Sequence, residues 1–262
     1  MILFSIVPSY FHAFTVNCIY CTIDSGKKLP CKQLFCALSA IFAAALFAAE
    51  PVMDLELNSG DTNSIKDLSA NKCKVTVSAP QKLSWVEGPD GKVLQFAGDR
   101  TAPRSVLQIA PPKSFNLAQG FTLRFAFKTP DDYQRNVRYQ LFQFGNGADK
   151  VTGVTLFLYW RAIHCRYGVK SSGAAQTPAS FVVKPATWYD CVVTYDTKNV
   201  VIYVNGKAVS KPTPATIGNI KGRWFTIGGT SPAGAGYAFK GLVSTAQIYN
   251  QALTAEEISN LD

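Results

Sequence analysis

Residues 200–209 read Val-Val-Ile-Tyr-Val-Asn-Gly-Lys-Ala-Val, and this stretch decides the fold class. A run of β-branched and aromatic residues leads into Asn205-Gly206, and a shorter apolar stretch follows. Asn-Gly suits the two positive-φ positions of a type I′ turn, which connects antiparallel strands tightly. The stretch therefore predicts a β-hairpin.

Strand-like runs extend outward from this hairpin in both directions. They are short, rich in alternating apolar residues and separated by Gly-, Pro- or Asn-containing turns. They lie at 74–77, 93–96, 105–109, 121–127, 139–144, 154–160, 188–195, 199–204, 224–227 and 242–249. So many strands at these intervals predict an all-β protein, with two antiparallel sheets in one domain.

One short helix is predicted at the C-terminal end. Thr254 and Glu257 have the spacing of a capping box, in which each side chain satisfies a backbone donor of the first turn. We interpret the helix as a structural cap on the sandwich.

A leader precedes these strands. Lys27, Lys28 and Lys32 come before the uncharged run 34–49, which ends in small residues. This order is typical of a secretory signal peptide, and we assign it to 27–49. We interpret 1–26 as a mis-assigned upstream extension, with a two-segment membrane anchor as the alternative. Cleavage would leave residues 50–262 as a secreted, periplasmic or cell-surface protein without a membrane span.

Composition excludes several function classes. The 262 residues carry 26 basic and 17 acidic side chains, a net charge of +9, which favours anionic partners. No zinc-finger or helix-turn-helix signature supports nucleic-acid binding. Only His12 and His164 are histidines, so His-rich metal sites are excluded. No serine-hydrolase, phosphate-loop or dinucleotide-binding motif occurs.

Several segments resemble the laminin-G-like jelly roll of the concanavalin A-like lectin/glucanase superfamily. They are FTLRFAFK at 121–128, TWYDCVVTYD at 187–196, VIYVNGK at 201–207 and QIYNQALTAEEI at 247–258. The resemblance spans about 52–262 and implies a two-sheet antiparallel jelly-roll sandwich. It also implies a family calcium site, but Ala97, Ser244 and Thr245 stand where the family has acidic residues. We therefore expect no cofactor or metal.

Catalysis is not expected. Glycosidases of this superfamily place carboxylates on alternate residues of one strand, and that pattern is absent here. Asp54 and Glu56 have strand spacing but lie in the first, edge strand, and Asp131-Asp132 follows Pro130 in a loop. His164 has no nucleophile motif beside it, so a polar core role is the simpler interpretation. A divergent glycoside hydrolase or lyase stays as the least favoured hypothesis.

The segment 128–170 is the best candidate for a ligand site. It has seven basic and three acidic residues, a net charge of +4, interleaved with aromatic residues. Aromatic faces suit sugars, and guanidinium groups suit carboxylate or sulfate. We predict that an acidic glycan binds to residues of this segment: Tyr133, Arg135, Arg138, Tyr159, Trp160 and Arg161. Whether Tyr159 or Trp160 faces the core stays open, because the two alternate along one predicted strand.

Three cysteines lie beyond the leader: Cys73, Cys165 and Cys191. Export permits disulfides, so a Cys165–Cys191 bond between neighbouring strands is a hypothesis. Cys191 alternatively replaces a small core residue. The sequence thus favours an exported, non-catalytic carbohydrate-binding module. The alternative is a structural or adhesive domain that contacts a cell-surface protein.

Overall fold

The structure is a computed structural model that describes residues 20–22, 28–30, 49–62, 64–145, 153–169, 173–218, 224–230 and 236–261. Two compact units divide the chain, Met1–Ala48 and Ala49–Asp262. In the first, β1 (Tyr20–Thr22) pairs with β2 (Lys28–Pro30). The predicted signal run lies almost wholly outside the described residues and stays a prediction. No helix among the described residues has the length and apolarity to cross a membrane.

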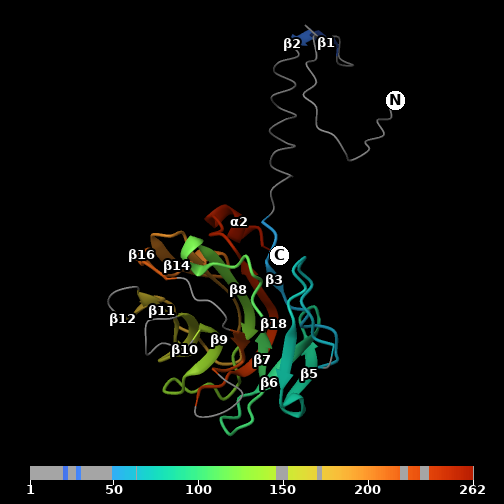
Figure 1. Cartoon of the computed structure of the whole chain (residues 1–262), viewed down its shortest axis with the longest axis vertical. Coiled ribbons are helices and arrows are strands. Elements are labelled where there is room, and N and C mark those ends of the chain that lie inside the picture. The colour runs from blue at the N-terminus through green and yellow to red at the C-terminus, as the bar shows by residue number, and fades with distance from the viewer. Residues whose placement is uncertain are drawn as a thin grey trace. The chain divides into compact units, whose positions relative to one another are not determined.

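The second unit is a sandwich of two antiparallel sheets (Figure 1). This confirms the predicted all-β, two-sheet class. The larger sheet has nine strands: β3 (Met53–Asp54), β5 (Leu83–Gly88), β6 (Gly91–Ala97), β8 (Phe121–Lys128), β13 (Trp188–Tyr195), β14 (Asn199–Val204), β15 (Lys207–Ala208), β16 (Thr213–Pro214) and β18 (Lys240–Tyr249).

The smaller sheet has seven strands and runs in the order β12-β11-β10-β9-β17-β7-β4. Its strands are β4 (Val75–Ser78), β7 (Val106–Ile109), β9 (Tyr139–Gly145), β10 (Gly153–Tyr159), β11 (Ala162–Val169), β12 (Gly173–Pro178) and β17 (Phe225–Ile227).

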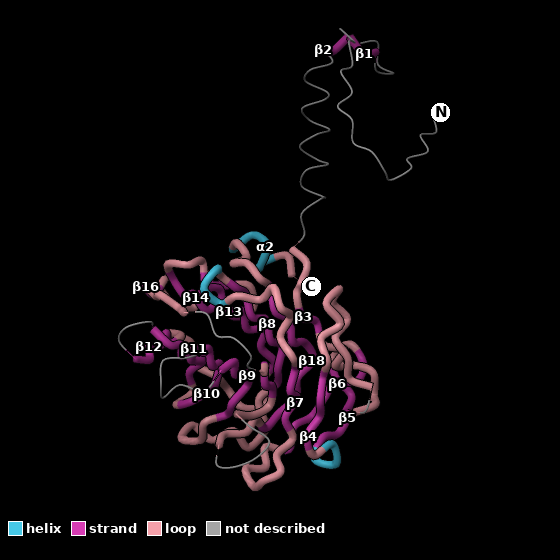
Figure 2. Tube along the Cα trace, in the orientation of Figure 1, coloured by secondary structure: helices cyan, strands magenta, loops and turns pink. Residues whose placement is uncertain are grey.

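Helical structure is confined to short segments among the described residues (Figure 2). Two are single 3₁₀ turns, η1 (Pro80–Lys82) and η2 (Leu117–Gln119). The third is α2 (Ala255–Ser259), where Glu257 N–H donates to Thr254 Oγ1 at 3.2 Å and Thr254 N–H donates to the Glu257 carboxylate at 2.7 Å. The predicted capping box is confirmed.

Aromatic residues from both sheets fill the space between them. On β8, Phe121, Leu123, Phe125 and Phe127 are all fully buried, as a two-residue period on one inward face requires. The ring of Phe125 lies 5.4 Å from that of Phe142 on β9 in the opposite sheet. These contacts fix how the two sheets face each other, and thereby which side chains of β10 and β11 point outward.

The predicted Cys165–Cys191 disulfide is not formed, and both thiols are free and fully buried. Cys165 lies on β11 of the seven-stranded sheet and Cys191 on β13 of the nine-stranded sheet, so the strands are not neighbours as expected. Burial raises the pKa of Cys165 to about 12 and that of Cys191 well above its usual value. Both behave as small apolar residues.

Candidate functional site

The hairpin of β10 and β11 presents two different faces. Val154, Leu156 and Leu158 pair with Tyr167, Cys165 and Ile163, and all six belong to the core. The alternating pairs point the other way, onto the outer face of the seven-stranded sheet: Thr155 with Arg166, Phe157 with His164, and Tyr159 with Ala162. Phe157 lies outside the core cluster although it is buried. The outer face is therefore where the site residues gather.

Trp160 and Arg161 form the tip of this hairpin rather than the end of a strand. Tyr159 pairs with Ala162, so the turn has two residues, and both have positive φ, +49° and +59°. That is the geometry of a type I′ turn, which normally takes Asn or Gly. A bulky residue in this conformation is strained by roughly 1–2 kcal/mol. The sequence prediction that the strand continues to Trp160 is wrong, because the turn lacks its usual residues.

The tip is held in place by the segment before β9. Trp160 N–H donates to the Arg135 carbonyl at 2.7 Å, and the Arg135 guanidinium carbon lies 5.3 Å from the centre of the Trp160 ring. The Tyr159 ring meets Trp160 edge-on at 5.7 Å. Trp160 nonetheless stays 55% exposed. It is thus a fixed indole whose surface is open to solvent beside an exposed cation.

Arg138 lies between two aromatic rings. Its guanidinium carbon is 3.8 Å from the centre of Phe157 and 4.4 Å from that of Tyr237. Its Nε and Nη2 donate to Gln140 Oε1 at 3.2 and 3.0 Å. A β-bulge orients this acceptor, because Leu156 pairs with Phe142 and Phe157 with Gln140, which leaves Leu141 extra on β9. Bulges of this kind re-aim side chains beside functional sites.

His164 completes the group by stacking on Phe157, with ring centres 5.1 Å apart and planes 18° apart. Gln176 Nε2 donates to His164 Nδ1 at 2.8 Å, so the ring proton lies on Nε2, which donates to the Tyr159 carbonyl at 3.0 Å. Burial is the main cause that lowers the pKa of His164, and the charge of Arg138 adds to it. His164 is therefore neutral, and its two hydrogen bonds fix the orientation of the ring that stacks on Phe157.

We call the group formed by Arg135, Arg138, Phe157, Tyr159, Trp160, Arg161, His164 and Tyr237 the aromatic–arginine cluster. The structure brings five of the six predicted site residues into it. Tyr133 is the exception, because it is buried and stacks on Tyr139 at 5.0 Å, so it offers no face to a ligand. Sequence reasoning missed Phe157, His164 and Tyr237. The alternation of β10 could have indicated Phe157. The glycine-rich run before Tyr237 indicates a loop that could line a site or merely connect strands, but no local signal joins Tyr237 to Arg138.

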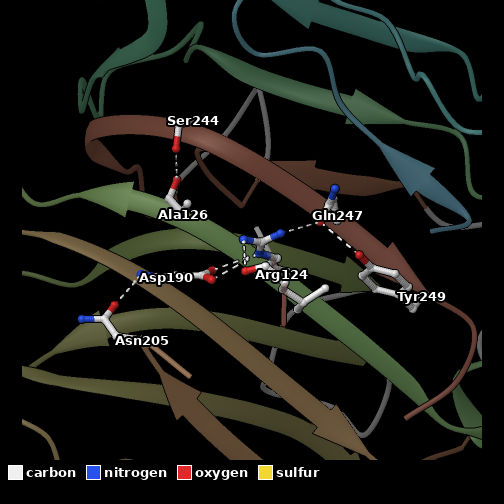
Figure 3. Close-up of polar contacts among 8 residues, drawn as sticks. Arg124, Ala126, Asp190, Asn205, Ser244, Gln247 and Tyr249 are labelled. Carbon is white, nitrogen blue, oxygen red and sulfur yellow. Dashed lines mark hydrogen bonds and ion pairs between the residues drawn. The ribbon is translucent and has the colours of Figure 1, made fainter. Parts of the chain in front are cut away.

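A second polar group lies on the opposite sheet (Figure 3). Arg124 Nε donates to both carboxylate oxygens of Asp190 at 3.2 Å, and its Nη atoms reach Gln247 Oε1 at 3.4 Å and the Leu261 carbonyl at 3.3 Å. The Arg124 side chain is only 8% exposed. Tyr249 Oη also donates to Gln247 Oε1. All three guanidinium nitrogens thus donate to acceptors within the fold, so we interpret this group as structural.

Two of the carboxylates considered as catalytic candidates, Asp132 and Asp54, have defined surroundings. Asp132 forms an ion pair with Lys240 at 2.5 Å, which lowers its pKa. Asp54 is half-buried on β3, and burial raises its pKa.

Among the described residues, no group of three or more His, Cys, Asp or Glu side chains could hold a metal ion. Ser244 lies at a bulge of β18, where it donates to the Ala126 carbonyl at 3.5 Å. The expectation of no calcium stays a prediction.

Residues 103–259 match the family model described as concanavalin A-like lectin/glucanases superfamily. The chain belongs to that superfamily. The match covers more than half of the sequence and includes the whole β10–β11 hairpin. No curated protein matches the sequence.

Solved structures share the concanavalin A-like fold at low identity. The binding domain of Paraclostridial Mosquitocidal Protein 1 superposes with a TM-score of 0.61 at 18% identity, over 80% of this chain and 51% of that one. The binding domain of Botulinum Neurotoxin DC, solved in complex with SialylT, gives 0.63 at 12% identity, over 81% and 50%. The chain spans about half the length of these structures, and the likeness establishes the fold alone.

Proposed function

We propose that the chain is an exported, non-catalytic recognition module that binds carbohydrate through the aromatic–arginine cluster. One observation carries this proposal: Trp160 is 55% exposed on a turn whose backbone disfavours it. Strain of this kind persists mainly where function requires a particular side chain. Packing does not explain Trp160, because more than half of its surface contacts nothing in the described chain.

The chemistry of the cluster indicates an acidic glycan. The indole face of Trp160 can stack on the apolar face of a sugar ring. Arg161 is the exposed residue that follows Trp160 in the turn, and the Arg135 guanidinium lies against the Trp160 ring, so two arginines adjoin the stacking residue. Guanidinium forks bind carboxylate and sulfate in a bidentate manner. A neutral sugar would leave these donors without a charged partner.

The ligands of two structural neighbours are consistent with this ligand class. One neurotoxin binding domain was solved with SialylT, and cell entry of botulinum neurotoxin type C, another neighbour, depends on interaction with two ganglioside molecules. These statements concern those proteins, whose identity to this chain is 12%. They support the proposal as an analogy between members of one fold class.

The non-catalytic part of the proposal rests on the absence of an acid–base pair from the cluster. Glycoside hydrolysis uses two carboxyl groups on either side of the scissile bond. The cluster, as the structure describes it, contains arginines, aromatic residues and one neutral histidine. Reducing-sugar release from acidic polysaccharides checks this directly, and release above the level of a heat-denatured sample would contradict it.

A protein partner is the second candidate. Val182 is 64% exposed, and Val183 N–H donates to the Arg161 carbonyl at 2.8 Å, so an open apolar side chain lies next to the hairpin tip. Another neighbour was solved in complex with rat synaptotagmin II. Exposed apolar groups of this kind are typical of protein contacts.

A glycan array with neutral, sialylated, uronate-containing and sulfated glycans tests the carbohydrate proposal. Wild type should bind acidic members, Trp160→Ala should lose about tenfold or more in affinity, and Arg161→Ala should lose the preference for acidic over neutral glycans. Trp224→Ala is the matched control, because Trp224 is also exposed, at 44%. Trp224 directly precedes β17, where Phe225 pairs with Phe144 of β9. Phe144 in turn pairs with Val154, which lies at the end of β10 opposite to the hairpin tip. Equal loss in both tryptophan variants, or no binding, would overturn the site.

A further inference from the structure

Three backbone segments meet at the tip of the β10–β11 hairpin. Trp160 N–H donates to the Arg135 carbonyl at 2.7 Å on one side, and Val183 N–H donates to the Arg161 carbonyl at 2.8 Å on the other. The segment that contains Val183 continues to Lys184, whose N–H donates to Tyr189 Oη at 2.8 Å and whose carbonyl accepts from Thr129 Oγ1 at 2.7 Å. The tip is thus anchored on both flanks.

The exposed side chains of these segments have two kinds of chemistry. Trp160 and Val182 are the two most exposed large apolar side chains of the described residues, at 55% and 64%. Three cationic side chains, those of Arg135, Arg161 and Lys184, are exposed around them. We call these five residues the docking tip. Exposed carboxylates occur in the 130–132 turn, where Ala186 N–H donates to the Pro130 carbonyl, and one of them, Asp132, is paired with Lys240.

From this arrangement we propose that the docking tip binds the surface of an anionic lipid bilayer, with Trp160 and Val182 inserted at headgroup depth. Indole is amphipathic and favours the interface between headgroups and acyl chains. Each Lys or Arg near an anionic leaflet strengthens attachment by about fivefold. The docking tip shares Arg135, Trp160 and Arg161 with the aromatic–arginine cluster. The proposal goes beyond glycan recognition because it also requires Val182 and Lys184, which lie outside that cluster.

The size of the tip favours a bilayer over a folded protein. A stable protein–protein interface buries roughly 800 Å² on each partner, with about 20–30 residues a side. The docking tip offers five side chains on a two-residue turn and the two segments that adjoin it. A fluid surface can accept two apolar side chains without a complementary pocket, and its negative charge complements the three cations.

Flotation with large unilamellar vesicles tests the proposal on the full chain. Vesicles of phosphatidylcholine and phosphatidylserine at 7:3 are compared with pure phosphatidylcholine, and neither carries a glycan. Wild type should partition more strongly to the anionic vesicles, and Val182→Asp and Trp160→Ser should each lower that partition about tenfold. Lys184→Gln should lower it about fivefold, whereas Trp224→Ser should leave it unchanged.

Tryptophan fluorescence separates the tip from the leader, because residues 1–49 contain no tryptophan. Brominated phosphatidylcholine in the anionic vesicles should quench emission of the wild type and of Trp224→Phe, but not of Trp160→Phe. Equal partition of the wild type and the tip variants, or quenching that survives Trp160→Phe, would overturn the proposal. Glycan-array binding without vesicle binding would overturn it too and leave the carbohydrate function standing. Vesicle binding without glycan binding would support the bilayer proposal and overturn the carbohydrate function.

Discussion

His164 shows how the surroundings of one residue set its chemistry. Its two ring nitrogens are engaged by Gln176 and the Tyr159 carbonyl, and its face is stacked on Phe157. Protonation would replace the acceptor at Nδ1 by a donor that faces the Gln176 amide, and would place a charge near Arg138. The residue interpreted from the sequence as a polar core histidine is therefore a neutral support of the cluster.

His164 should titrate below its ordinary pKa of 6.5 in the folded chain, because burial and Arg138 disfavour the imidazolium. The unfolded chain then binds the proton more readily, so stability is full above pH 6.5 and declines as the pH falls from 6.5 toward the folded pKa. NMR of the imidazole Cε1–H checks the midpoint, and His164→Gln assigns the signal, since His12 is the only other histidine. A midpoint at or above 6.5 would contradict this description.

Asp190 supports a guanidinium that is largely withdrawn from water. We expect Asp190→Ala to lower the free energy of unfolding by about 2–3 kcal/mol, because Arg124 keeps only the Gln247 and Leu261 acceptors. Urea denaturation measures this. Asp132→Ala is the control, since its ion pair with Lys240 is exposed and should change stability little. A double replacement, Arg124→Met with Asp190→Leu, should lower the free energy of unfolding by less than Asp190→Ala does. A larger loss in the double variant would contradict the role given to the ion pair.

At the scale of elements, two hairpins with the same turn geometry contrast. Asn205-Gly206 has φ of +49° and +74°, close to the values at Trp160-Arg161. The first turn is built from residues that tolerate this conformation, which is why the sequence predicted it correctly. The Trp160-Arg161 turn lacks such residues, so the sequence pattern predicted a strand that continued through Trp160. The bulge on β9 was equally invisible, because it depends on pairing with β10 rather than on a local motif.

Exchanging the strained turn for a relaxed one should separate stability from binding. We expect the double substitution Trp160→Asn and Arg161→Gly to raise the free energy of unfolding by about 1–2 kcal/mol, since both positions then accept positive φ. The same variant should lose glycan binding. Gly206→Ala is the converse control and should lower the free energy of unfolding by about 1 kcal/mol, because Gly206 has a positive φ. The added Cβ would meet no atom closer than Ser259 Cα at 3.8 Å, so the cost comes from the backbone alone. Unchanged or lower stability in the Asn-Gly variant would show that the turn is not strained.

At the scale of the whole molecule, alternation and turn signals predicted the all-β, two-sheet class, and the family resemblance added the jelly roll. Strands β5, β11 and β12 were not among the predicted runs. The site was only partly predictable. Neighbouring residues such as Arg135 and Arg138 could be grouped from the sequence, but Tyr237 reaches Arg138 from a segment about 100 residues away. The expectation that Cys165 and Cys191 lie on neighbouring strands was wrong for the same reason, since only the topology assigns them to different sheets.

We propose that one end of the β10–β11 hairpin receives an acidic glycan. The chain has four tryptophans, Trp85, Trp160, Trp188 and Trp224, so an indole ¹H–¹⁵N spectrum gives one signal for each. Titration with an acidic oligosaccharide selected from the array shows which of the four indoles the ligand reaches. We expect the Trp160 signal to shift in proportion to saturation while that of Trp224 stays in place. A shift of Trp224 alone, or equal shifts of all four signals, would contradict it.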